Sequence, residues 1–331
     1  MTRTDARVGV IGAGCRGRDL MRVADKLGAL AAVCDPSPDA LADAAKMYPR
    51  LNRFEDVEDL LRDPLDAILI AAPEESHAQL ALQCLAAGKH ILVEDPFTLS
   101  VADAEAVAAA AVATGLHVFV GHTLIYHSAI RKLRATIASG TLGRIWHLRS
   151  RRGCLGNLQQ HKSVWWSLAS RDVSLMLALM GEDPSNVVGA HSGWLTARRP
   201  DIAYADFQFP YGRSAHVEVT WLDPNDVWHL DVFGTQGVVR LVETSESCRM
   251  ELIRCGARSD ERGVLDSWRG GTMEIPYERS EPLHDEVLAF LTSLRFGIAA
   301  ETDANEGLAV VRTLALADRA AHLPYALEAR A

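Results

Sequence analysis

The sequence predicts an α/β fold: an N-terminal doubly wound parallel sheet, followed by an α+β domain with a large, open, mostly antiparallel sheet. Three observations carry this prediction. Short apolar runs alternate with helical segments over about the first 120 residues, a glycine-rich turn follows the first run, and strand-like runs succeed one another later in the chain. Alternating strands and helices form parallel sheets that are covered on both faces. The 331 residues, 48% of them hydrophobic, are enough for two cores, expected at 1–122 and 123–331.

Strands and helices alternate in the expected first domain. The strands are expected at Arg7–Gly12, Ala29–Asp35, Leu65–Pro73, His90–Pro96 and Leu116–His122. The helices are expected at Gly14–Gly28, Ser37–Tyr48, Val57–Asp63, Glu74–Gly88 and Ser100–Gly115. Ser37 and Ser100 are suitable N-cap residues, Pro38 suits a first helical turn, and Gly88 suits a helix end.

The second domain is expected to begin with a helix that leaves the first domain at Ile125 and ends at Gly140. Another apolar helix is expected at Asp172–Gly181. A helix pair is expected near the end of the chain, at Leu283–Gly297 and Asn305–Ala321, where it is able to pack back on the first domain. The strands of the open sheet are expected at Arg144–Arg152, Asn186–Leu195, Ala205–Gly212, Ser214–Leu222, Val227–Gly234 and Gly237–Glu243. Cys255–Gly271, rich in glycine and charge, is expected to be a loop.

Composition excludes several kinds of partner. A formal net charge of −9 argues against nucleic acid and against an anionic membrane. The six cysteines show no C-x-x-C pair, which indicates reduced thiols and no metal site. The first strand begins almost at once, so no signal peptide is expected, and the alanine-rich run 102–113 is too short to span a bilayer. We therefore expect a soluble, cytoplasmic protein.

A dinucleotide-binding motif lies in the first strand–helix unit. Gly12-Ala13-Gly14-Cys15-Arg16-Gly17 matches G-x-G-x-x-G, follows a predicted strand and opens a predicted helix. Such glycines let the backbone approach a pyrophosphate at the helix N-terminus. Asp35 ends the next strand, where it would accept hydrogen bonds from the ribose hydroxyls and repel a 2′-phosphate, which favours NAD over NADP. The structural alternative is a tight turn with Asp35 capping the following segment.

Several longer segments carry a resemblance to a known family. They are "VGVIGAGCRG", "AAPEESHAQLALQCLAAGKHILVEDP", "GTLGRIWHLRSRR", "WWSLASRDVSLMLALMG", "VTWLDP" and "EPLHDEVLAFLTSLRFG". Together they are similar to the Gfo/Idh/MocA family of NAD(P)-dependent sugar and cyclitol oxidoreductases, and most of all to members that act on nucleotide-linked amino sugars. The resemblance implies a Rossmann domain and an α+β domain whose open sheet carries a sugar or nucleotide-sugar ligand on one face and often a partner subunit on the other. It implies a homodimer or homotetramer.

The resemblance also implies which residues line the site. On the cofactor side these are Ala72, Pro73, His77, Glu94 and Asp95, with the 95–96 peptide expected to be cis. On the substrate side they are Arg149, His161, Trp166, Ser167 and Arg171.

The expected catalytic positions depart from the family. The family reads Glu-Lys-Pro at the strand end, where this chain has Glu94-Asp95-Pro96. In the similar subgroup a later motif reads Trp-Asp-Leu-Ala-Pro-His-Asp, where this chain has Trp166-Ser167-Leu168-Ala169-Ser170-Arg171-Asp172. A carboxylate at 95 would repel one at 167, and Ser167 removes that conflict. The three changes together indicate a rebuilt site more than a decayed one.

Four residues are candidates for the chemistry. Arg171 stays protonated at any working pH, so it can bind an anion but cannot transfer a proton. Asp95 is either a base or the partner of Arg171 in an ion pair. His122, at the end of a strand, and Tyr126, one turn further on, are possible substitutes for the lost acid and base.

Three functions remain open from the sequence. The first is an NAD-dependent oxidoreductase that acts on a sugar or nucleotide sugar through the altered site. The second is a redox-neutral or transiently redox enzyme that retains its NAD, for epimerisation, elimination or rearrangement. The third is a non-catalytic sensor of dinucleotide or sugar. Fold alone does not choose among them.

Overall fold

A computed structural model of the chain describes residues 6–155, 163–194, 200–259 and 262–321. The chain forms two compact units. The first consists of the chain up to His127 together with Ser280–Val311, and the second of Ser128–Arg279 together with the chain from Arg312. The chain therefore returns to the first unit after completing most of the second. Among the described residues, no helix is long and apolar enough to cross a membrane.

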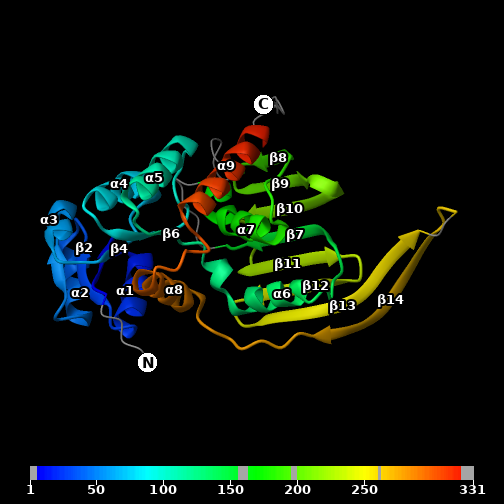
Figure 1. Ribbon diagram of the computed structural model, residues 1–331, viewed down its shortest axis with the longest axis horizontal. Helices are drawn as coiled ribbons and strands as arrows, with labels where there is room; N and C mark the ends of the chain where they lie inside the picture. Colours follow the sequence, from blue (N-terminus) through cyan, green and yellow to red (C-terminus); the bar gives the residue numbers. More distant parts are fainter. Residues whose placement is uncertain (1–5, 156–162, 195–199, 260–261, 322–331) are drawn as a thin grey trace. The chain divides into compact units, whose positions relative to one another are not determined.

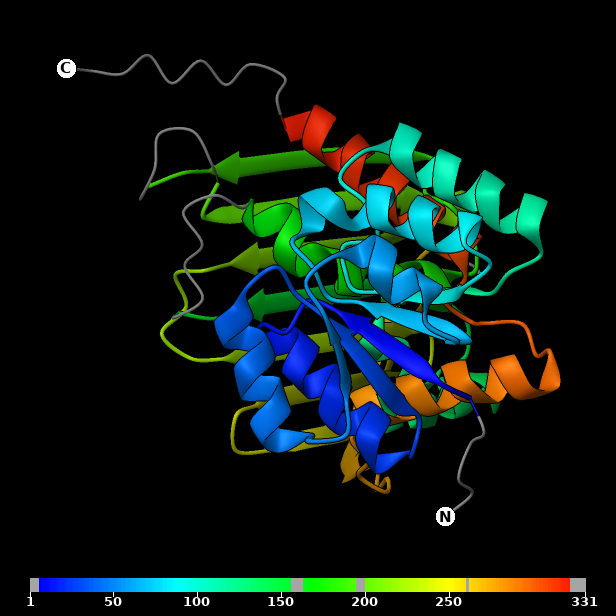
Figure 2. The same cartoon turned by 90° about the vertical axis from the view of Figure 1, so that its left-hand side faces the viewer.

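The first unit is built on a six-stranded parallel sheet of order β3-β2-β1-β4-β5-β6. Its strands are β1 Val8–Ile11, β2 Leu30–Cys34, β3 Asn52–Phe54, β4 Ala67–Ile70, β5 His90–Val93 and β6 Val118–Val120. Its helices are α1 Cys15–Lys26, α2 Pro38–Met47, α3 Val57–Arg62, α4 His77–Ala86, α5 Val101–Thr114 and α8 Pro282–Phe296, with short 3-10 turns η1 Glu74–Ser76 and η2 Thr123–Tyr126. Helices cover both faces of this sheet (Figures 1 and 2), so the predicted doubly wound fold is confirmed.

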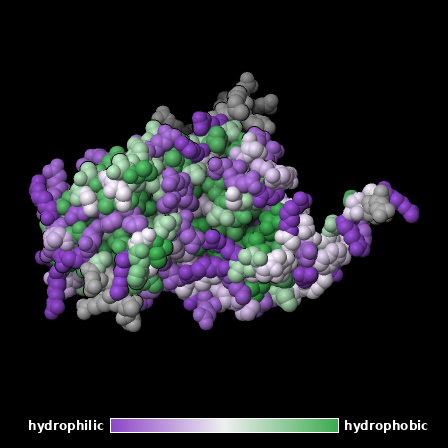
Figure 3. Space-filling model, viewed as in Figure 1, coloured by the Kyte–Doolittle hydropathy of each residue, from purple (hydrophilic) through white to green (hydrophobic). Residues whose placement is uncertain are grey.

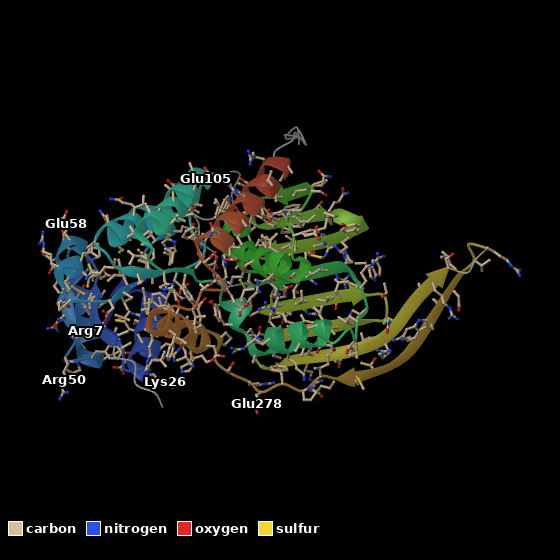
Figure 4. The ribbon with its side chains drawn as sticks, in the orientation of Figure 1. Arg7, Lys26, Arg50, Glu58, Glu105 and Glu278 are labelled. Carbon is tan, nitrogen blue, oxygen red and sulfur yellow. The ribbon has the colours of Figure 1, made fainter. Side chains whose placement is uncertain are left out.

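Local sequence explains these elements. Every residue of β1 and β4 is buried, as continuous apolar runs in a parallel sheet require. Ser37 and Ser100 cap α2 and α5, their hydroxyl oxygens accepting the main-chain N–H groups of Ala40 and Asp103. Charged side chains such as Lys26, Arg50 and Glu58 are exposed and point outward (Figure 4).

The second unit carries an eight-stranded sheet of order β14-β13-β12-β11-β7-β10-β9-β8. Its strands are β7 Ile145–Gly153, β8 Asn186–Ser192, β9 Ile202–Phe209, β10 Arg213–Thr220, β11 Val227–Gly234, β12 Gly237–Thr244, β13 Cys248–Ser259 and β14 Leu265–Glu274. Neighbouring strands are antiparallel except β7 and β10, which confirms the predicted mostly antiparallel sheet. The helices are α6 Ser128–Ala138, α7 Val164–Met180 and α9 Ala304–Ala321, the last shared with the first unit.

The prediction of a loop at Cys255–Gly271 is wrong. The ends of β13 and β14 pair with each other from Cys255 with Arg269 to Ser259 with Leu265, beyond the part of β13 that pairs with β12. All ten residues of β14 are exposed, and the far end of this hairpin is largely hydrophilic (Figure 3). Main-chain pairing holds this ribbon together with the Arg258–Asp266 ion pair and the stacking of Arg254 on Trp268. Its exposed strands therefore lack the apolar alternation by which strands are recognised.

A pair of histidines joins the starts of β5 and β6. Nδ1 of His90 accepts the main-chain N–H of His117 at 2.9 Å, and the two ring centroids are 5.1 Å apart. The bond requires an unprotonated Nδ1 on His90. Burial lowers the pKa of His90 below its usual value, His117 lowers it further, and Asp66 opposes the shift. A positive charge on His90 is therefore unfavourable in the folded protein.

Acid should destabilise the first unit through this pair. The folded-state pKa of His90 lies below the unfolded value of about 6.5, so its contribution to the free energy of unfolding is present above about pH 6.5 and is lost as the pH falls toward the folded value. His90→Asn keeps an acceptor for the His117 N–H and cannot be protonated, so it should lose less stability between pH 8 and pH 5.5. Urea unfolding of both proteins at the two pH values tests this, and equal losses would contradict it.

Candidate active site

The glycine-rich turn between β1 and α1 has two kinds of glycine. Gly12 has φ +95°, and a Cβ there would lie 2.5 Å from the Ala71 carbonyl oxygen. A Cβ on Gly17 would lie 1.8 Å from the Gly12 carbonyl oxygen. The protein's own packing therefore requires both. A Cβ on Gly14, in contrast, would meet nothing within 4 Å, so Gly14 leaves bare backbone facing open space, as approach of a pyrophosphate requires.

Asp35 closes this turn at the end of β2. Its Oδ2 accepts the main-chain N–H of Ala13 at 2.7 Å, and its Oδ1 accepts that of Ser37 at 2.8 Å. Each carboxylate oxygen can accept a second hydrogen bond, so the group remains able to bind ribose hydroxyls. Cys15 is exposed at the first position of α1. The turn and Asp35 thus fit a dinucleotide.

His77 connects the ends of β4 and β5. Its ring is 2% exposed, with Nδ1 2.8 Å from the Pro96 carbonyl oxygen and Nε2 2.9 Å from that of Ala72. A neutral ring donates only one of these bonds. Ala72 and Pro73 lie just after the end of β4 at Ile70, and the Asp95–Pro96 peptide is cis, as expected. His77 therefore supports the turn that presents Asp95, which is partly exposed.

Glu94 and Arg16 link the end of β5 to the glycine-rich turn. The Glu94 side chain is buried, and its Oε1 lies 2.8 Å from Nε of Arg16 on the first turn of α1. Nη2 of Arg16 donates to the hydroxyl of Thr123 at 3.3 Å, directly after His122. The fold therefore brings together residues predicted to bind the cofactor: Glu94 at the end of β5 and Arg16 beside the glycine-rich turn.

His122 and Tyr126 lie after β6 with different partners. Nδ1 of His122, whose side chain is 1% exposed, is 2.7 Å from Oε2 of Glu306. The Tyr126 hydroxyl bonds to the Thr302 hydroxyl at 3.0 Å. Burial raises the pKa of Tyr126 well above its usual value. Glu306 and Thr302 were not foreseen, because nothing in the sequence connects positions more than 170 residues apart.

The second unit holds the remaining candidates on α7. Trp166, Ser167 and Arg171 are partly exposed, and the neighbouring Asp172 is buried. Asp172 accepts the Ser150 hydroxyl at 2.6 Å and Nε of Arg152 at 2.7 Å. These bonds fix the turn of α7 that carries Arg171.

Arg152 and Arg171 both lie close enough to Cys154 to influence its thiol. Burial raises the pKa of the Cys154 thiol, with Asp226 adding to the rise, while Arg152 and Arg171 oppose it. Both guanidinium groups therefore act on the same thiol.

Arg149 lies apart from α7. Because side chains alternate along a strand, Arg149 faces away from Ser150 and Arg152, on the open side of the sheet, where it pairs with Asp231. His161 lies outside the described residues. An Asp95–Arg171 ion pair stays a prediction, since the two residues belong to different units, and so does a subunit contact through the open face.

Known proteins match the chain along most of its length. The family model of the Gfo/Idh/MocA oxidoreductases with an NAD-binding Rossmann fold matches residues 6–122, and that of the C-terminal domain of the same family matches 130–240. The chain is 32% identical to UDP-N-acetylglucosamine 3-dehydrogenase of Acidithiobacillus ferrooxidans over 55% of this chain and 56% of the relative. It is 24% identical to 2,7-anhydro-N-acetylneuraminate hydratase of Escherichia coli over 73% of this chain and 69% of the relative.

A solved structure shares the fold over both units. The WlbA dehydrogenase of Bordetella pertussis, in complex with NADH and UDP-GlcNAcA, superposes with a TM-score of 0.79 at 20% identity over 96% of each chain. Several of the curated relatives are matched over only about half of their length.

Proposed function

Because the chain belongs to the Gfo/Idh/MocA family of oxidoreductases, we propose that it is an NAD-dependent enzyme that oxidises or reduces a carbon of an anionic sugar or nucleotide sugar. In this proposal His122 transfers the proton, and Arg171 binds the negative group of the substrate. The observation that carries the proposal is the His122–Glu306 pair, at the carboxyl end of the sheet that bears the glycine-rich turn. Ligands of open α/β sheets bind at this end.

His122 is the proposed base when a hydroxyl is oxidised. Bound NAD supplies the acceptor for the hydride that leaves the substrate carbon. With Nδ1 of His122 held 2.7 Å from the Glu306 carboxylate, the ring proton is favoured at Nδ1 and the lone pair at Nε2. Nε2 is buried in the folded chain, and the carboxylate would stabilise the imidazolium that forms when a bound substrate gives its hydroxyl proton to Nε2. Tyr126 is less suited to this step, since its raised pKa keeps the phenol protonated.

Asp35 supports NAD as the cofactor in preference to NADP. Its two hydrogen bonds to main-chain N–H groups hold the carboxylate at the end of β2. There it would repel a 2′-phosphate while its remaining lone pairs accept ribose hydroxyls.

Arg171 supports an anionic substrate. It stands at the position where the similar subgroup has histidine, and it cannot take part in proton transfer. Its guanidinium suits a carboxylate, bound through two parallel hydrogen bonds. A carboxylate is present in the N-acetylneuraminate named for one relative, and an amino sugar linked to UDP in the other. We therefore propose a carboxylated sugar, free or linked to a nucleotide, as the substrate class.

A redox-neutral reaction is the second candidate. The relative from Escherichia coli is a hydratase, so a net reaction without oxidation occurs among proteins similar to this chain. In that case Asp95 would serve as the base, NAD would stay with the protein, and the cofactor would show no net change.

Substrate class can be tested through Arg171. With NAD, the wild type should form reduced nicotinamide on uronic acids or their nucleotide-linked forms, and less on the matched neutral sugars. Arg171→Met should lower kcat/KM on the acids by roughly 10- to 100-fold, the value of a hydrogen-bonded charge, and should change the neutral sugars little. Arg50→Met, on the exposed surface, is the control. Equal losses on acids and neutral sugars would refute the assignment.

A further inference from the structure

Glu286 is a buried carboxyl group that the proposed chemistry does not use. It lies on α8, its side chain is 0% exposed, and its Oε1 is buried without a hydrogen-bond partner in the described part of the chain. Its Oε2 is 3.1 Å from the hydroxyl oxygen of Thr123. A fully buried carboxyl group with a hydrogen bond on only one of its two oxygens lowers the stability of the fold. Its presence here therefore points to a functional reason.

Thr123 connects Glu286 to the cofactor-binding turn. The same hydroxyl oxygen receives a hydrogen bond from Nη2 of Arg16 at 3.3 Å, and Nε of Arg16 lies 2.8 Å from Glu94. Elements distant in sequence thus meet around one guanidinium group: the first turn of α1, the end of β5, η2 and α8. The Arg16 side chain is 39% exposed, so part of it remains open to a ligand.

The hydrogen bonds around Thr123 favour one protonation state of Glu286. The Thr123 hydroxyl has one proton and two possible acceptors, Glu286 Oε2 and the Gly121 carbonyl oxygen at 3.3 Å. If Glu286 is neutral, its O–H donates to Thr123, and Thr123 donates to Gly121. If Glu286 is ionised, Thr123 can serve only one of the two oxygens. The neutral form gives a hydrogen bond to each of these three oxygens: Glu286 Oε2, the Thr123 hydroxyl and the Gly121 carbonyl.

The surrounding charges favour the same form. Burial raises the pKa of Glu286 well above its usual value, and Glu94 and Asp95 raise it further, while Arg16 and the Thr123 hydrogen bond oppose the rise. Glu281, the N-cap residue of α8, forms an ion pair with Arg22 of α1. Two carboxylates and one guanidinium group, those of Glu94, Asp95 and Arg16, already act on Glu286, so its ionisation would add a third negative charge behind the turn.

We infer that Glu286 is a positioning residue for the dinucleotide: in its neutral form it holds Thr123 and Arg16 in place, and its ionisation in alkaline solution weakens NAD binding. The physical reason is repulsion, because the cofactor's pyrophosphate is negative and the turn that receives it lies beside Arg16. This inference rests on the proposed NAD site. The carboxyl group neither touches the substrate nor transfers a proton to it.

The test is the pH dependence of NAD affinity. In the wild type, the Kd measured by calorimetry should be flat at low pH and should rise by about tenfold once Glu286 ionises, as one added negative charge nearby predicts. Glu286→Gln, which can still donate to Thr123, should bind NAD at neutral pH within about twofold of the wild type and should show no rise. Glu58→Gln, an exposed carboxyl on α3, should keep the wild-type rise.

The outcomes separate this inference from the proposed function. If the wild type binds no NAD at neutral pH, the proposed function fails. If it binds but Glu286→Gln shows the same rise, or a folded Glu286→Gln binds poorly at every pH, only the inference fails. If the variant does not fold, the inference is tested on the wild type by the infrared band of a protonated carboxyl group. Bound NAD should raise the pH at which that band disappears. A band that is absent at neutral pH, or one that disappears at the same pH with and without NAD, would overturn the inference.

Discussion

Replacing Gly14 by alanine should weaken NAD binding by roughly 10- to 100-fold, about 1.4–3 kcal/mol, while the folded protein stays close to wild type in stability. The added Cβ would meet no protein atom within 4 Å, and the backbone at Gly14, φ −67° and ψ −166°, is open to alanine. Alanine is a poorer N-cap than glycine but lowers the entropy of the unfolded chain, and these effects oppose each other.

Two other glycines make the comparison sharp. Gly17→Ala places its Cβ 1.8 Å from a main-chain oxygen, so it should lower the free energy of unfolding itself. Gly271→Ala, also in open space but in the second unit, should change neither quantity. Titration with NAD and with NADP, alongside thermal unfolding, gives all the values. A Gly14→Ala protein that binds NAD as tightly as the wild type would show that the space above Gly14 is not the pyrophosphate site.

His122→Gln should lower kcat by about 10²- to 10⁴-fold, the usual contribution of a positioned acid or base, and should leave NAD affinity nearly unchanged. Glu306→Gln should lower kcat by a smaller factor than His122→Gln. It should also move the acidic limb of the kcat/KM profile to lower pH, because the imidazolium loses the carboxylate 2.7 Å away that stabilises it.

Tyr126→Phe is the matched control for this prediction. It removes a hydroxyl that bonds only to Thr302 among the contacts described, and the rate should fall by less than about threefold, the loss of one neutral hydrogen bond. Steady-state rates over a range of pH test all three variants, with thermal unfolding to show that each is folded. Full activity in His122→Gln together with inactivity in Asp95→Asn would transfer the role of base to Asp95.

Local signals explain what the sequence predicted well. The glycine-rich turn, the capped helices and the fully apolar strands are each encoded within a few neighbouring residues, so the parallel sheet and the position of Asp35 followed from pattern alone. The sheet order then brings Arg16, Glu94 and Thr123 together at the carboxyl ends of the strands.

Long-range packing explains what the sequence did not predict. Packing of the terminal helices on the first domain was among the expectations, but no local pattern marks Glu286 and Glu306, which lie more than 160 residues after their partners. Arg152 rather than Arg149 contacts Asp172 on α7. The two arginines lie on opposite faces of the sheet, and a shift of the strand by one residue would exchange those faces. The far end of the β13–β14 hairpin is held by main-chain pairing and polar side-chain contacts between largely exposed residues, which leaves no hydrophobic signature.

The most direct test of the proposed function follows a labelled hydrogen. The protein is incubated with NADH that carries deuterium at its transferable position and with the keto form of the best acid from the substrate panel, and the product is analysed by mass spectrometry. The account predicts a product alcohol that has gained one deuterium while NADH is consumed. A product without deuterium, formed while the amount of NADH stays constant, would contradict it and indicate the redox-neutral reaction.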